Sequence, residues 1–133
     1  MKRSYRQWHF SFLAAVILMT GCVLSKQAEK ILPAHDEVLI YALPYDLVYL
    51  RTLEALENVD GWELEETEKE KGLIVARNVS FGNLSDADKR LATFYVTRIN
   101  RNETSVALAK KSVHVLGGDT LLERISEFVS REI

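Results

Sequence analysis

The hydrophobic pattern of residues 37–130 changes its period in a fixed order, and this order restricts the possible fold more than any other feature of the chain. Residues 37–43, EVLIYAL, are rich in strand-forming side chains. Pro44 follows and suits the first turn of a helix. Residues 45–59 then place apolar side chains on one face at helical spacing, which predicts an amphipathic helix ending at Asp60-Gly61: Tyr45, Val48, Tyr49, Thr52, Leu53, Leu56 and Val59.

The rest of the chain is typical of strands followed by one more helix. Residues 62–79 predict a hairpin whose charged turn ends in Gly72, and residues 90–99 and 104–115 predict two longer strands. Residues 120–133 predict a helix, with Thr120 and Glu123 spaced as a capping box. The order strand, helix, four strands, helix predicts an α+β fold in which a single antiparallel sheet carries two helices on one face.

The first 21 residues have the character of a secretory signal. Lys2, Arg3 and Arg6 give a positive start, residues 10–19 are almost wholly apolar, and Thr20-Gly21 are small. A transmembrane helix needs about 17–25 apolar residues. The run is shorter than that, so a removed signal peptide is preferred over an uncleaved anchor.

Cys22 is the only cysteine of the chain and directly follows this run. The pentapeptide LMTGC resembles the lipobox of bacterial lipoproteins, with Met19 in place of the usual Leu. The resemblance implies cleavage between Gly21 and Cys22, a covalent lipid on the Cys22 thiol, and no other cofactor. The alternative is an ordinary secreted protein with an unpaired cysteine, but the chain has neither an A-x-A exit nor a second cysteine.

The lipobox resemblance also predicts a location and a domain organisation. Val23 stands where an Asp would imply retention in the inner membrane. The expected location is therefore the outer membrane, facing the periplasm. The predicted organisation is a signal peptide over residues 1–21, the lipidated cysteine and a tether over residues 22–36, and an α+β domain over residues 37–133.

The charge of the predicted mature chain excludes one class of partner. The whole sequence has 17 basic and 19 acidic residues, and the predicted signal removes three basic residues and no acidic ones. The remainder is acidic, whereas nucleic-acid binding needs a basic patch. No nucleic-acid partner is expected.

Residues 45–76 resemble the first half of the helix-grip domains of small bacterial lipoproteins, among them the C-terminal domains of BamC and short lipoproteins of unknown function. GGDTLLERI, residues 117–125, resembles the entry to the last helix of these domains. The shared features are structural, so the resemblance implies the fold and not an activity: Tyr49, Leu53, Ala55, Leu56, Gly61, Trp62, Gly72, Leu73 and Ile74. BamC has two such domains, whereas this chain has one.

No constellation of catalytic or metal-binding residues is apparent. His9, His35 and His114 lack metal-ligand spacing, and neither a Gly-rich phosphate loop nor a G-x-S-x-G motif occurs. The glutamates of residues 63–70, mixed with Lys69 and Lys71, predict a solvated strand edge. The alternative is an acidic docking surface or a weak divalent-cation site. The sequence therefore predicts that the protein is not an enzyme and holds no metal.

Four apolar residues are candidates for a partner surface. Leu47 and Leu50 fall outside the apolar helix face, and either meet a partner or cover the sheet rim or the tether, with the second preferred. Phe81 and Leu84 lie in a loop-like segment and either meet a partner or close the core.

The prediction for function is a membrane-anchored envelope lipoprotein with a non-catalytic binding or scaffolding module, with another envelope protein as the possible partner. The alternative is a carrier or sensor of a small apolar ligand, held in a cavity between sheet and helix. The side chains expected to line that cavity are aromatic: Tyr49, Trp62, Phe94 and Phe128.

Overall fold

The computed structural model describes residues 34–80 and 90–131. The chain divides into two units, Met1–Leu32 and Pro33–Ile133, and all described residues belong to the second. The elements of the second unit, in chain order, are β1 (Val38–Tyr41), α1 (Tyr45–Glu57), β2 (Trp62–Glu68), the 3-10 turn η3 (Lys69–Lys71), β3 (Leu73–Asn78), β4 (Leu91–Asn100), β5 (Glu103–Leu108), the 3-10 turn η4 (Lys110–Ser112) and α3 (Gly118–Ser130).

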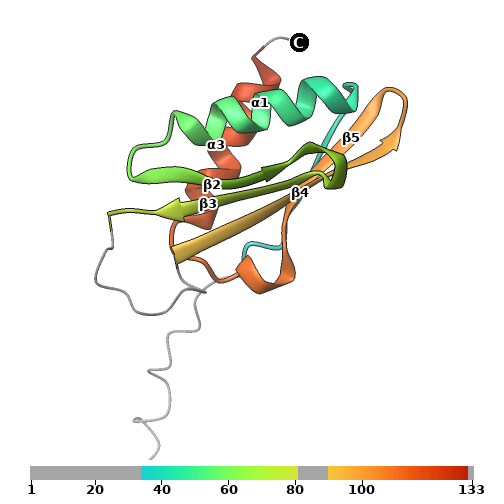
Figure 1. Cartoon of the computed structure of the whole chain (residues 1–133). Coiled ribbons are helices and arrows are strands. Elements are labelled where there is room, and N and C mark those ends of the chain that lie inside the picture. Colours follow the sequence, from blue (N-terminus) through green and yellow to red (C-terminus); the bar gives the residue numbers. More distant parts are fainter. Residues whose placement is uncertain (1–33, 81–89, 132–133) are drawn as a thin grey trace, which may run out of the picture. The chain divides into compact units, whose positions relative to one another are not determined.

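The described strands form one five-stranded sheet in the order β1-β5-β4-β3-β2, and every neighbouring pair is antiparallel. Helices α1 and α3 pack against each other on one face of this sheet (Figure 1). The predicted α+β fold with two helices on one face is therefore confirmed, including the order strand, helix, four strands, helix. The first and last strands in sequence pair with each other, so β1 and β2 become the two edges.

The core lies between the sheet and the two helices. Register places Phe94 of β4 opposite Ile74 of β3 and Leu108 of β5, so all three point to the helix side. Phe94 is fully buried, as are Leu56 of α1 and Ile125 of α3. Apolar side chains from β3, β4, β5 and both helices thus form one contiguous cluster.

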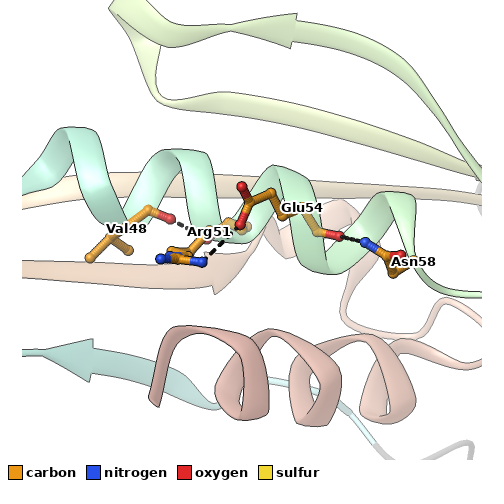
Figure 2. A network of polar contacts seen from close by, with 5 residues as sticks. Val48, Arg51, Glu54 and Asn58 are labelled. Atoms are coloured by element: carbon orange, nitrogen blue, oxygen red, sulfur yellow. Dashed lines mark hydrogen bonds and ion pairs between the residues drawn. The ribbon is translucent and has the colours of Figure 1, made fainter. Parts of the chain in front are cut away.

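Helix α1 buries the face that its periodicity predicts, including Val48 and Leu56. Its polar groups bond along the helix (Figure 2): the Arg51 guanidinium lies 3.1 Å from the Glu54 carboxylate, and the Thr52 hydroxyl donates to the Val48 carbonyl at 2.8 Å. The Asn58 amide donates to the Glu54 carbonyl at 2.7 Å, which satisfies a carbonyl left over at the helix end. The helix therefore ends at Glu57, two residues before the predicted end at Val59.

The strand predicted over residues 104–115 is too long, because β5 ends at Leu108. The chain turns away through η4, and Ser112 takes over part of the pairing with β4. Its hydroxyl accepts a hydrogen bond from the Thr93 N–H at 3.0 Å and donates to the Leu91 carbonyl at 3.2 Å. A buried side chain thus replaces a strand backbone, which a period-2 pattern cannot reveal. His114 consequently lies in the turn before α3 and not near a strand end.

The predicted capping box of the last helix is also wrong. Helix α3 begins at Gly118, two residues before Thr120, so Thr120 lies inside the first turn. Its N-cap is Gly117, in a left-handed conformation and without a side-chain cap, and the Gly117 carbonyl accepts from the Leu121 N–H at 3.1 Å.

In residues 34–80 and 90–131, no helix is both long enough and apolar enough to cross a membrane.

Candidate functional site

Two of the four predicted partner-surface residues can be located. Leu50 lies on α1 with 52% of its surface exposed, and Leu47, one turn earlier, is half-buried. Phe81 and Leu84 lie outside the described residues, as do Gly21 and Cys22. The predictions for those four positions therefore stay predictions.

Leu50→Glu is expected to change the free energy of unfolding by less than about 0.5 kcal/mol, because the side chain is exposed. Leu53→Glu is the matched comparison, since Leu53 lies three residues along the same helix and packs against the core cluster. It should cost several times more, because a carboxylate would replace buried apolar surface. Urea unfolding followed by circular dichroism measures both. A large loss for Leu50→Glu would place Leu50 in the core.

The glutamate-rich strand β2 is an edge of the sheet, as predicted for a solvated strand edge. Arg77 of the neighbouring strand lies 3.6 Å from the Glu63 carboxylate and 3.7 Å from that of Glu65. The register shifts between Leu64 and Glu66, which marks a β-bulge. Among the residues that the structure describes, no group of three acidic, histidine or cysteine side chains is placed to hold a metal ion.

A groove of about 520 Å³ lies between the start of β1 and helix α3. One wall consists of residues 34–37 with Leu39, and the other is a single face of α3 from Asp119 to Ser130. The His35 N–H donates to the Val113 carbonyl at 2.7 Å and holds the first wall in place. The His35 ring lies so close to Gly118 that a β-carbon there would come within 2.7 Å of it.

The groove is acidic. Asp36 and Glu37 line one wall, and Asp119, Glu123 and Glu127 line the other at helical spacing. Of these five carboxylates, only that of Glu127 forms an ion pair with a described residue, with Arg124 at 3.2 Å and Arg131 at 4.0 Å. The arrangement favours a cationic ligand, and the apolar side chains that line the groove are Ala34, Leu39 and Leu122.

The phenol of Tyr41 lies behind this groove. Tyr41 is the last residue of β1, and 7% of its surface is exposed. Burial raises the pKa of Tyr41. The neighbouring Ser126 side chain, which lines the groove, lowers this pKa to a smaller extent. Among the described residues, no group meets ordinary hydrogen-bond limits with the Tyr41 hydroxyl. Tyr41 thus belongs to the core cluster and neighbours Ser126 of the groove wall.

The second hollow, of about 320 Å³, lies where the start of α1 meets η3 and β4. The Tyr45 hydroxyl donates to the Lys69 carbonyl, and the Arg98 guanidinium lies 5.3 Å from the centre of the Tyr45 ring. Lys69 lies 2.7 Å from Asp46. This contact lowers the pKa of Asp46 and raises that of Lys69. These contacts hold the start of α1 against the turn between β2 and β3. We therefore assign the residues around this hollow a structural role.

The aromatic residues predicted to line a ligand cavity have another role. Tyr49, Trp62 and Phe94 belong to the buried core cluster, and Phe128 packs against it. Neither of the two hollows described above is lined by any of them.

The open face of the sheet, opposite the helices, carries exposed apolar side chains. Val38 of β1, Ala107 of β5 and Tyr95 of β4 lie in one cross-strand row, and Ile40 lies two residues along β1 from Val38. The exposed fractions are 54% for Val38, 60% for Ile40 and 45% for Tyr95. Local sequence patterns do not reveal this row, because it depends on pairing between β1 and β5, which are far apart in the chain.

Comparison with known proteins gives a structural likeness only. No protein-family model matches the sequence, and no curated protein matches it. Among solved structures, the chain is similar to the Zhui aromatase/cyclase from Streptomyces sp. R1128, with 15% identity, coverage of 72% of this chain and 83% of that chain, and a TM-score of 0.37. At this identity the likeness concerns the fold alone. That protein is an enzyme, so the prediction that the present chain is not an enzyme is contradicted, and we withdraw it.

Proposed function

We propose that this protein is a lipid-anchored lipoprotein of the cell envelope whose α+β domain binds another envelope protein. The observation that carries the proposal is the sequence LMTGC, in which the only cysteine of the chain ends the apolar run of a signal-like segment. A thiol-linked diacylglyceryl group together with an acylated amine supplies two or more chains, which is enough for stable anchoring. The location proposed is the outer membrane, with the domain in the periplasm.

The described domain supports a binding role through its open sheet face. Exposed apolar side chains gathered in one place are typical of protein or membrane contacts, whereas single exposed ones are ordinary. Val38, Ile40 and Tyr95 form such a group across neighbouring strands. No observation on the described residues favours the alternative of a carrier or sensor of a small apolar ligand in a cavity between sheet and helix.

Replacing Cys22 by alanine tests the anchor. The natural protein is expected in carbonate-washed membranes, without residues 1–21 and with the added mass of the lipid on Cys22. Cys22→Ala should be unprocessed or soluble, because it lacks the thiol that takes the lipid. Ser25→Ala, three residues away, is the matched control and should behave as the natural protein does.

Membrane fractionation combined with intact-mass spectrometry distinguishes the outcomes. A Cys22→Ala protein that loses the signal and still stays in carbonate-washed membranes would show that lipidation is not the anchor. A natural protein that carries no lipid would overturn the proposed localisation as well.

A further inference from the structure

The two edges of the sheet are built differently. Edge strand β2 carries five glutamates with its turn and contains a bulge between Leu64 and Glu66. Charges and bulges are the devices by which proteins keep an edge strand from pairing with another chain. Edge strand β1, Val-Leu-Ile-Tyr, has no charge and no bulge, and it pairs with β5 in unbroken register. Of the two edges, β1 is therefore the one that lacks the charges and the bulge that hinder pairing.

The free edge of β1 lies beside the acidic groove. Among the described strands, β1 pairs only with β5, so its second edge has no strand partner there. Leu39 of β1 lines the groove, whose far wall is α3. Figure 2 shows β1 and α3 together below α1. A strand added to β1 would lie about 4.8 Å away, along the groove.

The negative charge of the groove determines which kind of segment can bind along β1. Asp36, Glu37, Asp119 and Glu123 line it and form no ion pair with any described residue. A second copy of this chain, paired edge to edge, would bring two sets of these carboxylates together, which is unfavourable. A segment rich in Lys or Arg would instead be attracted, and its aliphatic stems would pack on Leu39 and Leu122.

We propose that β1 is a docking strand, which accepts an extended, cationic segment of a partner protein by strand addition. Alternate residues of an added strand point to opposite faces of the sheet. The Lys or Arg side chains of the segment would enter the groove along α3, and the apolar residues between them would extend the open sheet face beside Val38 and Ile40. This inference rests on the proposed binding function, and it identifies the surface and the chemistry of the partner.

A synthetic peptide provides the direct test. The probe is Ac-KVKIKVK-amide with a fluorescent label, titrated against the full-length protein in non-ionic detergent and followed by anisotropy. Asp119→Lys with Glu123→Lys should weaken binding by at least about ten-fold, because the groove then repels the probe. Glu66→Lys with Glu70→Lys is the matched control. It makes the same change of net charge near the other edge and should leave affinity within about two-fold.

Two further measurements separate strand addition from charge attraction. The same peptide with alternate backbone nitrogens methylated keeps its charge but loses the N–H groups on one edge, so it should bind at least about ten-fold more weakly. Binding of the unmethylated probe should also slow amide hydrogen exchange over residues 38–41. Equal affinity for the methylated peptide, or equal loss in the two charge-reversed variants, would overturn the proposal.

The other occupants are identified by the same titration. Binding that appears only after Lys26→Glu with Lys30→Glu would assign the edge to the chain's own preceding segment and overturn the partner assignment. A dimer that Ile40→Lys dissociates, together with no probe binding, would assign the edge to a second copy. If the probe fails while Cys22-dependent anchoring holds, only the docking strand is wrong. If anchoring fails while the probe binds, only the localisation is wrong.

Discussion

Gly72→Ala is expected to lower the free energy of unfolding by about 2–5 kcal/mol. Gly72 follows η3 in a left-handed conformation, with φ of 67°, which costs a residue with a side chain about 1–2 kcal/mol. The added β-carbon would also lie 2.0 Å from the Val96 carbonyl oxygen. Overpacking of this kind costs about 1–3 kcal/mol more.

The contact at Gly72 is hard to relieve because both backbones are already fixed. The Val96 N–H donates to the Gly72 carbonyl at 2.8 Å, and the Gly72 N–H donates to the Lys69 carbonyl at 3.1 Å. Moving Gly72 away from β4 would weaken the first bond and disturb the turn that joins β2 to β3. We therefore expect the hairpin to be displaced from the sheet, with reduced protection of β3 amides against hydrogen exchange.

Gly117→Ala is the matched control, because Gly117 has the same handedness without the collision. Its φ is 81°, and the nearest atom to an added β-carbon is Trp62 Cζ2 at 3.6 Å. In this variant the free energy of unfolding should fall only by the cost of a left-handed backbone conformation, about 1–2 kcal/mol. Urea unfolding of the two variants isolates the effect of the Val96 carbonyl as their difference. Equal losses would show that the close approach at Gly72 has no energetic consequence.

The regular elements of the fold could be predicted because each has a period of its own. The apolar face of residues 45–57 and the alternation in residues 62–65 follow from local spacing, and the class and order of these two elements are confirmed. The ends of these elements could not be predicted so well, because hydrogen bonds from individual side chains to the backbone determine them. Asn58 ends α1 by bonding a backbone carbonyl, and Ser112 replaces the end of β5.

The groove and the open edge could not be predicted from local patterns. Both arise because β1 pairs with β5, which places residues 34–39 beside α3 although about 80 residues separate them in the chain. The acidic residues of α3 appear in the sequence only as the polar side of an amphipathic helix. The sequence located acidic charge correctly on β2, but that strand is the protected edge and not the one that faces the groove.

Phe94→Ala is expected to lower the free energy of unfolding by about 3–5 kcal/mol, the usual range for removing a buried aromatic side chain. Phe94 has 0% of its surface exposed and lies between Ile74 and Leu108 in the central strand of the sheet. Because β3 and β5 hold the backbone of β4 on both sides, the surroundings cannot close the resulting cavity. The midpoint of urea unfolding, followed by circular dichroism, measures the loss.

Tyr95→Ala is the matched control for Phe94→Ala, one residue further along β4 but on the open face. It removes an aromatic ring of similar size that is 45% exposed, so it should cost less than about 1 kcal/mol. The pair therefore tests which face of the sheet holds the core. If Tyr95→Ala were as costly as Phe94→Ala, something would cover the open face in the free protein. Val38 lies in the same cross-strand row as Tyr95, and Ile40 lies two residues along β1. Both side chains would then also be covered and could not contact the apolar residues of a docked strand.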